Sequence, residues 1–549
     1  MTAAPDFGLS VVIATHNRRE LLRRCLESLS AQTQDPATFE VIVADDGSSD
    51  GSAEMAEAFG APYRLRVLRL PKGGKSAALN AAIEQAAGLA CLFIDDDVIA
   101  SPALVAEHAA AHREEPKVLA IGKLTQPPPE SGDWFAIAHA EAWNERYETL
   151  AGKRVDWPDT YGGNFSAPRE PLLAAGGFDA ELPAVEDIEL GYRLCEAGCR
   201  VRYLPGAEGV HDDEEKPRRK VLADVRGFGG FCAEFSARWP AARAKLLGWF
   251  LDTTPREVML RRLFLTLRLP PRMLAMLGAA IPGQGRKGVW FGFVSRYAFW
   301  LGARSAMSRG AWLETTRGVP VLMYHGFTDS GERDRYVIPS RSFRRQMRIL
   351  AALGRKAISF EELARSLRKG VPLPRRAVVI TIDDGYRDNF ELAFPILRRQ
   401  RIPATIFLVS RKLGGSNDWG DEGAVADRPI LAAEQVEAMA AEGVGFGAHT
   451  RSHPRLPELG DDAVSEEIAG SKDDLEGLLG EAVETFAYPY GRFDERAVTA
   501  CEQAGFAAAC TTENRHAHIG DAPMLIPRIE IRGSDSLPRF LRKLWFAGD

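Results

Sequence analysis

Three largely apolar runs in this 549-residue chain end abruptly in consecutive aspartates. They are residues 39–44 before Asp45-Asp46, residues 89–94 before Asp95-Asp96-Asp97, and residues 377–382 before Asp383-Asp384. A continuous apolar run of this length is typical of a strand that is buried on both faces, as in a parallel sheet. The pattern therefore favours an α/β fold in which carboxylates stand at the carboxyl ends of strands, where ligands gather in such sheets.

Strands and helices are expected to alternate in both halves of the chain. Strand patterns at 9–14, 39–44, 66–70 and 89–94, with helical patterns at 18–30 and 75–87, predict an N-terminal, doubly wound, Rossmann-like parallel sheet. Strand patterns at 320–325, 376–382, 404–409, 443–448 and 485–488, with a helical pattern at 341–353, predict a C-terminal irregular (β/α) barrel. The length exceeds what one hydrophobic core supports, so several domains are expected.

The overall composition is ordinary for a soluble globular protein. The chain is 45% hydrophobic and 26% charged, and its net charge of −6 gives it no general attraction for nucleic acid. Seven scattered cysteines indicate free thiols in a reducing compartment. The first residues lack a signal-peptide pattern, and no run of about 18 apolar residues predicts a spanning helix. We expect a cytoplasmic protein.

A three-ligand metal site is predicted in the C-terminal half. His449 and His453 stand four residues apart after a glycine-rich strand, and Asp383-Asp384 end another strand. One aspartate and two histidines can bind a divalent metal and leave a position open for water, while the other aspartate acts as a base on that water. The pattern indicates a metal-assisted hydrolase. The alternative is that the aspartates form a turn or helix cap and the histidine spacing is coincidental.

The N-terminal acidic clusters suggest chemistry on a nucleotide diphosphate. Asp95 and Asp97 could hold a Mg²⁺ or Mn²⁺ that bridges the diphosphate, and Asp46 is placed to accept hydrogen bonds from a base. Residues 72–76 lack the spacing of a phosphate-binding P-loop, which disfavours ATP hydrolysis. The alternative is that these acids only form turns and caps at strand ends.

Residues 9 to about 215 resemble a family 2 glycosyltransferase with the GT-A fold. The matching stretches are 10–17 (SVVIATHN), 43–48 (VADDGS), 74–80 (GKSAALN), 95–97 (DDD), 162–165 (GGNF), 176–179 (GGFD) and 186–190 (EDIEL). The resemblance implies that nucleotide-sugar contacts are made by Thr15, Asp46, Lys75, Asn80 and Asp95, which shares the metal with Asp97.

The same resemblance makes Asp187 the general base that deprotonates the acceptor hydroxyl, with inversion at the anomeric centre. Judged from sequence alone, Asp187 could equally cap the following helix. His211 is a candidate additional metal ligand, although a lone histidine is more often structural.

Residues 319–532 resemble the polysaccharide deacetylases, the family 4 carbohydrate esterases with NodB homology. Residues 381–385 (TIDDG) stand for the family's Thr-Phe-Asp-Asp-Gly, and 449–453 (HTRSH) for its metal histidines. The resemblance implies that Asp383 is the base and that Asp384, His449 and His453 bind Zn²⁺ or another divalent transition metal. It makes the backbone N–H of Tyr490 the oxyanion donor in removal of an N-acetyl group.

Two departures from this family pattern concern the base and the acid. An arginine is missing before Tyr488-Pro489-Tyr490, and Arg528 is the candidate replacement as partner of the base. The family's C-terminal histidine motif has no clear match, so His325 is our first choice for the general acid. His516 and His518 are weaker choices, because their polar surroundings predict a surface loop.

The segment 241–311 differs from both halves. It holds twelve Lys or Arg residues against two acids, interleaved with aromatic residues, and prolines divide it into short helices. Such a segment suits a membrane surface with anionic lipids. The alternative is a helical linker whose apolar faces pack on the flanking domains.

We therefore expect three regions: a glycosyltransferase domain at 1–240, a basic amphipathic linker at 241–316 and a deacetylase domain at 317–549. The predicted function is sugar transfer, with N-acetylglucosamine from its uridine diphosphate donor, to a saccharide or lipid-linked acceptor, coupled to N-deacetylation of an N-acetylhexosamine. The predicted location is the cytoplasm, at the inner face of the membrane. The alternative is that only one half is active and the other is a carbohydrate-binding module or a membrane-bound scaffold.

Overall fold

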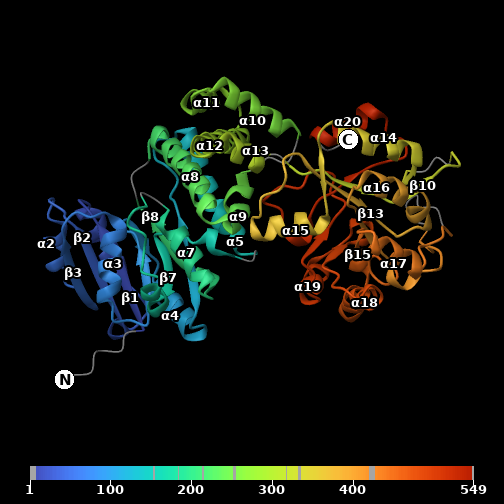
Figure 1. Cartoon of the computed structure of the whole chain (residues 1–549). Coiled ribbons are helices and arrows are strands. Elements are labelled where there is room, and N and C mark those ends of the chain that lie inside the picture. The colour runs from blue at the N-terminus through green and yellow to red at the C-terminus, as the bar shows by residue number, and fades with distance from the viewer. Residues whose placement is uncertain are drawn as a thin grey trace. The chain divides into compact units, whose positions relative to one another are not determined.

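The chain folds into two compact α/β units, each built from two separate stretches of sequence (Figure 1). The computed structural model describes residues 8–546 apart from 153–154, 183–184, 213–215, 251–254, 317, 332–334 and 420–426. Unit 1 comprises Met1–Phe231 and Leu269–Gly302, and unit 2 comprises Cys232–Arg268 and Ala303–Asp549.

Unit 1 is organised around an eight-stranded sheet with the order β3-β2-β1-β4-β7-β6-β8-β5. Its strands are β1 (Leu9–Thr15), β2 (Phe39–Asp46), β3 (Arg64–Leu70), β4 (Ala90–Ile94), β5 (Val98–Ala100), β6 (Val118–Thr125), β7 (Asn164–Pro168) and β8 (Arg200–His211). The predicted parallel arrangement is confirmed for β3-β2-β1-β4. The remainder is mixed, since β7 runs antiparallel to β4 and β6, and β5 antiparallel to β8.

Helices cover both faces of this sheet, as a doubly wound fold requires. The helices are α1 (Arg19–Ser30), α2 (Ser52–Glu57), α3 (Lys75–Gln85), α4 (Leu104–Glu114), α5 (Trp134–Leu150), α6 (Arg169–Ala174), α7 (Glu186–Glu196) and α8 (Arg218–Arg238). Neighbouring residues of one strand point to opposite faces. Val11 and Ile13 therefore pack in a core with α1, α4 and α5, whereas Val12 packs in a second core with α3 and α7.

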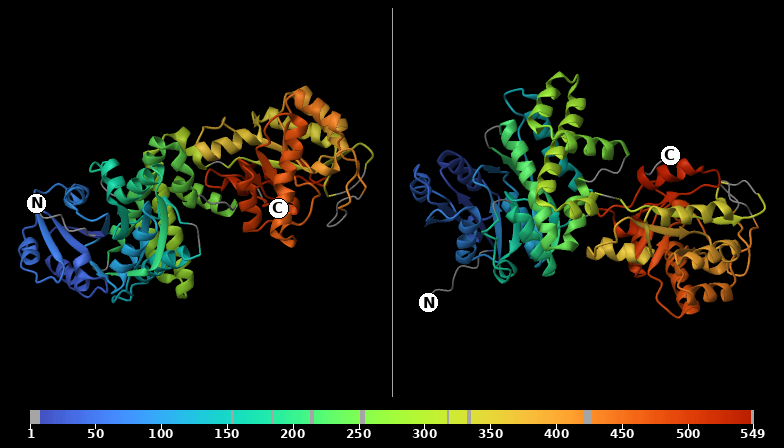
Figure 2. Two further views of the ribbon diagram at one scale, coloured as in Figure 1. Left: turned by 90° about the horizontal axis from the view of Figure 1, so that it is seen from below. Right: turned by 45° about the horizontal axis from the view of Figure 1, so that its top comes forward.

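Unit 2 is organised around a parallel sheet with the order β17-β16-β15-β14-β13-β9-β18, with β12 beside β13. The strands are β9 (Val321–Tyr324), β12 (Lys356–Ile358), β13 (Ala377–Ile382), β14 (Thr405–Leu408), β15 (Gly445–Ala448), β16 (Thr485–Ala487), β17 (Ala508–Cys510) and β18 (Ile529–Glu530). An isolated bridge joins Cys510 to Ile526, just before β18, so the sheet curls into an irregular barrel. In both views of Figure 2 the C-terminal segment (red) accordingly lies against the first strands of the unit (yellow).

The barrel is filled from inside and covered from outside. Its interior holds Val321, Val379 and Phe407, while Val378 and Ile380 of the same β13 face the surrounding helices. The helices are α14 (Ser340–Ala352), α15 (Phe360–Lys369), α16 (Phe394–Gln400), α17 (Ala433–Ala441), α18 (Asp461–Leu479), α19 (Glu495–Gln503) and α20 (Leu537–Phe546). The helix predicted at 341–353 is α14, and the strands predicted around the motif residues are confirmed with shorter ends.

The segment 241–316, predicted to be a linker, is divided between the two units. It forms α9 (Arg243–Leu247), α10 (Pro255–Leu267), α11 (Pro271–Leu277), α12 (Gln284–Ala306) and α13 (Arg309–Thr316). Within unit 1, α12 packs closely on α8, because a Cβ at Gly229 would lie 2.1 Å from the Phe299 carbonyl oxygen. Side chains of Tyr297, Phe299 and Trp300 are buried. The burial of these three aromatic residues agrees with the alternative that apolar faces of the segment pack on the protein, and contact of the segment with a membrane stays a prediction.

Among the residues that the structure describes, no helix qualifies as a candidate membrane span.

Candidate active sites

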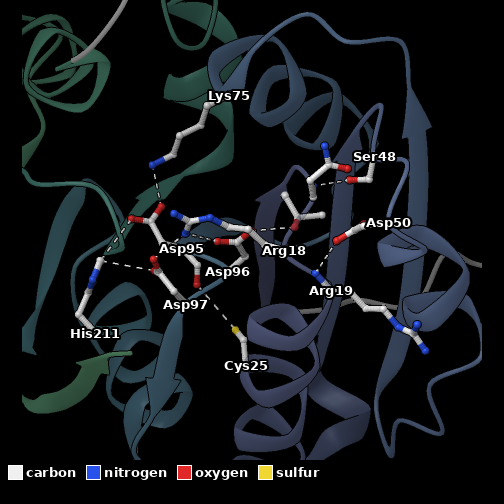
Figure 3. A network of polar contacts seen from close by, with 12 residues as sticks. Arg18, Arg19, Cys25, Ser48, Asp50, Lys75, Asp95, Asp96, Asp97 and His211 are labelled. Atoms are coloured by element: carbon white, nitrogen blue, oxygen red, sulfur yellow. Dashed lines mark hydrogen bonds and ion pairs between the residues drawn. The ribbon is translucent and has the colours of Figure 1, made fainter. Parts of the chain in front are cut away.

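Asp95, Asp97 and His211 converge at one end of the sheet of unit 1 (Figure 3). The aspartates follow β4, and His211 ends β8. His211 Nε2 lies 3.9 Å from Asp95 Oδ2 and 3.5 Å from Asp97 Oδ1. That Asp97 oxygen is buried and has no hydrogen-bond partner among the described residues. Two carboxylates and an imidazole with an unsatisfied inward oxygen fit a divalent cation such as Mg²⁺ or Mn²⁺.

Two cations and a hydroxyl relieve the repulsion among the three aspartates. Lys75 Nζ at the start of α3 lies 2.6 Å from Asp95 Oδ1, and Arg18 Nη1 lies 2.7 Å from Asp97 Oδ2 and 3.1 Å from Asp96 Oδ1. Thr15 Oγ1 donates a hydrogen bond to Asp96 Oδ2 at 2.7 Å. Burial would raise the pKa of Asp95, but the charge of Lys75 outweighs burial and holds that pKa below its usual value. Sequence reasoning missed the role of Arg18, which lies three residues after the end of the first strand.

Asp187 lies in the first turn of α7, beside a strained backbone. Val185 has a φ of 67°, a left-handed conformation that is unusual for a β-branched residue. The carboxylate of Asp187 accepts hydrogen bonds from the backbone N–H groups of Ile188, at 2.8 Å, and of Gly162. Burial, together with the charge of Glu186, raises the pKa of Asp187 to about 6. The Asp187 carboxylate therefore binds a backbone N–H group in the first turn of α7. Its raised pKa is also close to the value that a general base needs.

Gly162 and Gly163 lie between the carboxylates of Asp187 and Asp95. A Cβ at Gly162 would lie 3.1 Å from Asp187 Oδ2 and 3.7 Å from Lys75 Nζ. At Gly163, which has a φ of 99°, it would lie 2.9 Å from Asp95 Oδ2. Side chains at either glycine would therefore fill the space between the carboxylates of Asp187 and Asp95.

Asp46 and Asn80 have backbone partners within the protein. The carboxylate of Asp46 accepts hydrogen bonds from the N–H groups of Gly73, at 2.6 Å, and Gly74, at 3.0 Å. Asn80 exchanges two hydrogen bonds of 2.8 Å with the backbone of Phe178. These contacts shape the loop before α3 and the turn before Phe178. Contacts of Thr15, Asp46, Lys75 and Asn80 with a nucleotide sugar stay predictions.

Asp384, His449 and His453 converge in unit 2. His449 Nε2 lies 3.6 Å and His453 Nε2 3.4 Å from Asp384 Oδ1. His449 Nδ1 is 2.7 Å from the Ala487 carbonyl oxygen, which fixes this nitrogen as the donor and leaves Nε2 to face Asp384. All three side chains are buried. The donor set and its supporting hydrogen bond fit Zn²⁺ or another divalent transition metal.

Asp383 is paired with Arg528, as predicted for the missing arginine. The two are 145 residues apart in sequence, yet Arg528 donates hydrogen bonds of 2.6 and 2.7 Å to the two carboxylate oxygens. Burial would raise the pKa of Asp383, but the charge and hydrogen bonds of Arg528 outweigh burial and hold that pKa below its usual value. For Asp384, burial prevails and raises the pKa. The geometry keeps Asp383 ionised, which is the state that a base requires.

Backbone strain is concentrated around this second site. Asp384, Thr450, His453 and Tyr490 have φ values of 70°, 65°, 64° and 58°. Each left-handed non-glycine residue costs on the order of 1 kcal/mol or more, and such residues cluster at functional sites. The strain therefore supports a catalytic or binding role for this end of the barrel.

A cavity of about 260 Å³ opens over these groups. His325 lies in its wall, with its ring 4.8 Å from that of Tyr336, and its buried Nδ1 has no hydrogen-bond partner among the described residues. Trp419 stacks on His453 at 4.4 Å, and Tyr490 meets the same ring edge-on at 4.6 Å. Sequence reasoning missed Trp419 and Tyr336, because no local motif marks them.

His516 and His518 are not among the residues that line this cavity. The prediction of a surface loop is wrong for His518, which is buried, because its imidazole packs against the backbone at Gly318. His516 bonds instead to the Lys543 carbonyl oxygen at 2.9 Å.

Two α/β units, each with carboxylates and imidazoles converging at strand ends, define an enzyme with two catalytic domains. The model of the family "Glycosyl transferase family 2" matches residues 10–172, and that of "Polysaccharide deacetylase" matches residues 370–509. YxkH of Bacillus subtilis (strain 168), whose name places it among the polysaccharide deacetylases, is 30% identical over 205 residues, which are 37% of this chain and 68% of YxkH. The chain belongs to the polysaccharide deacetylase family, and its N-terminal part is a family 2 glycosyltransferase domain.

Two further relatives carry more specific names. Validoxylamine A glucosyltransferase of Streptomyces hygroscopicus subsp. limoneus is 29% identical over 266 residues, covering 43% of this chain and 58% of that protein. Poly-beta-1,6-N-acetyl-D-glucosamine N-deacetylase of Staphylococcus aureus (strain MSSA476) is 25% identical over 228 residues, covering 40% of this chain and 75% of that protein. The protein is thus similar to named enzymes in both of its domains.

Proposed function

We propose that this enzyme transfers N-acetylglucosamine from its uridine diphosphate donor to a saccharide or lipid-linked acceptor, and removes the acetyl group from an N-acetylhexosamine. The observation that carries the proposal is the pairing of a base with a three-ligand set in each domain. Asp187 accompanies Asp95, Asp97 and His211, and Asp383 accompanies the Asp384 set.

In the deacetylase domain, Asp384, His449 and His453 would hold Zn²⁺ or another divalent transition metal, which supplies Lewis-acid polarisation of the amide carbonyl and of a water molecule. Asp383, kept ionised by Arg528, accepts a proton as the water oxygen bonds to the carbonyl carbon. The Tyr490 N–H donates a hydrogen bond to the oxygen that becomes negative.

The C–N bond then breaks, and the amine nitrogen that leaves must gain a proton. His325 is the proposed donor, because it lies in the wall of the same cavity as Asp383. The products are acetate and a free amino sugar, so the atoms and the proton balance.

In the glycosyltransferase domain, Asp95, Asp97 and His211 would hold Mg²⁺ or Mn²⁺, which neutralises charge on the leaving diphosphate. Asp187 accepts the proton of the acceptor hydroxyl, whose oxygen bonds to the anomeric carbon opposite the departing diphosphate. This displacement inverts the anomeric centre. The pKa of about 6 leaves Asp187 largely ionised at pH 7, in support of this role.

The choice of donor follows from the two domains being in one chain. An N-deacetylase requires a substrate that carries an N-acetyl group, and N-acetylglucosamine transferred by the first domain would provide it. One relative is named for the N-deacetylation of a polymer of that sugar. The seven cysteines are all thiols, which supports a reducing, cytoplasmic location.

The test is mass spectrometry of products made from a panel of nucleotide sugars with saccharide acceptors or a membrane lipid extract. We expect the mass of one N-acetylhexosamine to be added and an acetyl group to be lost. Asp384→Ala should leave an acetylated product, and Asp187→Asn should leave no product. If Asp384→Ala did not change the acetylation of the product, coupling of the two reactions would be excluded.

A further inference from the structure

The helices between the two domains contain a long stretch without negative charge. Residues 258–313 include no Asp or Glu and nine basic residues, in a chain whose net charge is −6. The basic residues are Arg261, Arg262, Arg268, Arg272, Arg286, Lys287, Arg296, Arg304 and Arg309. This stretch is therefore strongly basic, whereas the chain as a whole is acidic.

In unit 1, α11 and the start of α12 expose apolar side chains within this stretch. Met273, Met276, Leu277 and Val289 are 41%, 69%, 56% and 78% exposed. The opposite face of α11 packs on its own unit: Leu274 and Ala275 are buried, and a Cβ at Gly278 would clash with the Trp134 ring. The exposed side chains are thus on the outer face of a helix that is anchored by its inner face.

Basic residues accompany these apolar side chains. Arg272 and Arg286 are exposed and Lys287 is half-buried, and none of them has an ion-pair partner among the described residues. Because there is no acid nearby in sequence, their charge is not neutralised locally. The outer face therefore combines exposed hydrocarbon with positive charge.

Helix α10, in unit 2, shows the same pattern independently. Met259, Leu263 and Leu267 are 60%, 49% and 55% exposed, and their spacing of four residues places them in one stripe. Arg262 is exposed beside them. An amphipathic helix normally buries its apolar stripe, so an exposed one marks an interaction surface.

We infer that the outer face of α11 and the start of α12 in unit 1, defined by Arg272–Val289, binds the surface of a bilayer that contains anionic lipids, and that the stripe Met259–Leu267 of α10 in unit 2 is, by itself, a second face of the same kind. Apolar side chains enter the boundary of the acyl chains while arginines and lysine meet the negative headgroups. Charge complementarity favours this occupant over a second copy of the chain, because a symmetric contact would bring two acid-free faces together. The inference rests on the proposed function, since it names the membrane partner of a lipid-linked acceptor.

The surface is tested by sedimentation of the full-length protein with phosphatidylcholine vesicles, with and without 30% phosphatidylglycerol. The wild-type protein should bind only the anionic vesicles, and increasing salt should weaken binding. The double variant Met276→Glu/Leu277→Glu should bind at least about tenfold more weakly, since each buried apolar side chain contributes about that much. Leu89→Glu is the matched control: Leu89 is apolar and 70% exposed on unit 1 but lies outside these faces, so binding should be unchanged.

Three results would overturn the inference. If the wild-type protein does not bind anionic vesicles at low salt, or if the double variant binds as well as the control, the inference is overturned. It is also overturned if the double variant changes the oligomeric state instead of vesicle binding, since a second copy would then be the occupant.

Sugar transfer to a water-soluble acceptor, measured without vesicles, separates this inference from the proposed function. The double variant should retain that activity. Vesicle binding without any transfer would refute the proposed function and leave the surface standing, and transfer without vesicle binding would do the reverse.

Discussion

The Arg528–Asp383 pair allows a quantitative test of how the deacetylase base is kept ionised. Both side chains are buried, with exposures of 0% and 3%, and two hydrogen bonds of 2.6 and 2.7 Å join them. Arg528→Met retains an unbranched apolar stem but removes the guanidinium, which leaves the carboxylate buried without its partner. With charge centres about 4 Å apart and an effective dielectric constant of about 20, the lost attraction is about 4 kcal/mol. Removal of one member of a buried pair costs about 3–5 kcal/mol, which agrees.

The sign of the pH dependence follows from the direction of the pKa shift. In the wild-type protein the folded-state pKa of Asp383 is lowered, so its stabilisation is present above the unfolded-state pKa of about 3.9 and is lost as the pH falls through the folded-state pKa. Without Arg528, burial prevails and raises that pKa. The stability difference between variant and wild type should therefore be largest near pH 8 and shrink on acidification.

The assay is urea unfolding of the full-length protein, monitored by hydrogen exchange of peptides from β13, so that the signal comes from unit 2. Asp383→Asn and the double variant Asp383→Asn/Arg528→Met complete a double-mutant cycle. We expect a coupling free energy of about 3 kcal/mol or more. A loss below about 1 kcal/mol in Arg528→Met, or additive losses in the cycle, would refute the view that Arg528 compensates the buried carboxylate.

Three other predictions concern catalysis. Acetate release from N-acetylated chito-oligomers should be abolished by a chelator and restored by Zn²⁺. Asp384→Asn should lower the rate of acetate release at least about a hundredfold. Activity that survives chelation would contradict a metal site. For sugar transfer, kcat/KM should rise with pH through about 6, because Asp187 must be deprotonated, and a profile without that limb would show another base. His325→Gln should lower deacetylation about 10²–10⁴-fold but spare esters whose leaving groups need no proton, and equal losses on both substrates would argue against a general acid.

The sequence predicted best those site residues that stand next to a recognisable strand pattern. Asp95, Asp97, Asp383 and Asp384 stand directly after buried strands, so their positions followed from strand patterns alone. Parallel strands end at a common edge, which also brought His449 close to the aspartates. For these residues, the strand pattern in the sequence and the parallel topology of the sheet predict the same position.

Contacts between residues far apart in the chain were harder to predict from the sequence. Arg528 was only a candidate, because nothing in its neighbourhood refers to a carboxylate 145 residues away. Arg18 binds Asp97 across 79 residues and was missed. The antiparallel direction of β7 was missed as well, since a buried apolar run looks the same in either direction.

The make-up of the two compact units has a consequence for how this enzyme can be divided. The backbone passes from one unit to the other after Phe231, again after Arg268 and again after Gly302. A single break at any point leaves at least one unit without part of its own helices, so one cut cannot yield both units whole, although residues 1–302 contain all of unit 1 and residues 232–549 contain all of unit 2. The two domains are always made in a one-to-one ratio in the intact chain, and separating the two units whole requires two overlapping fragments that share residues 232–302.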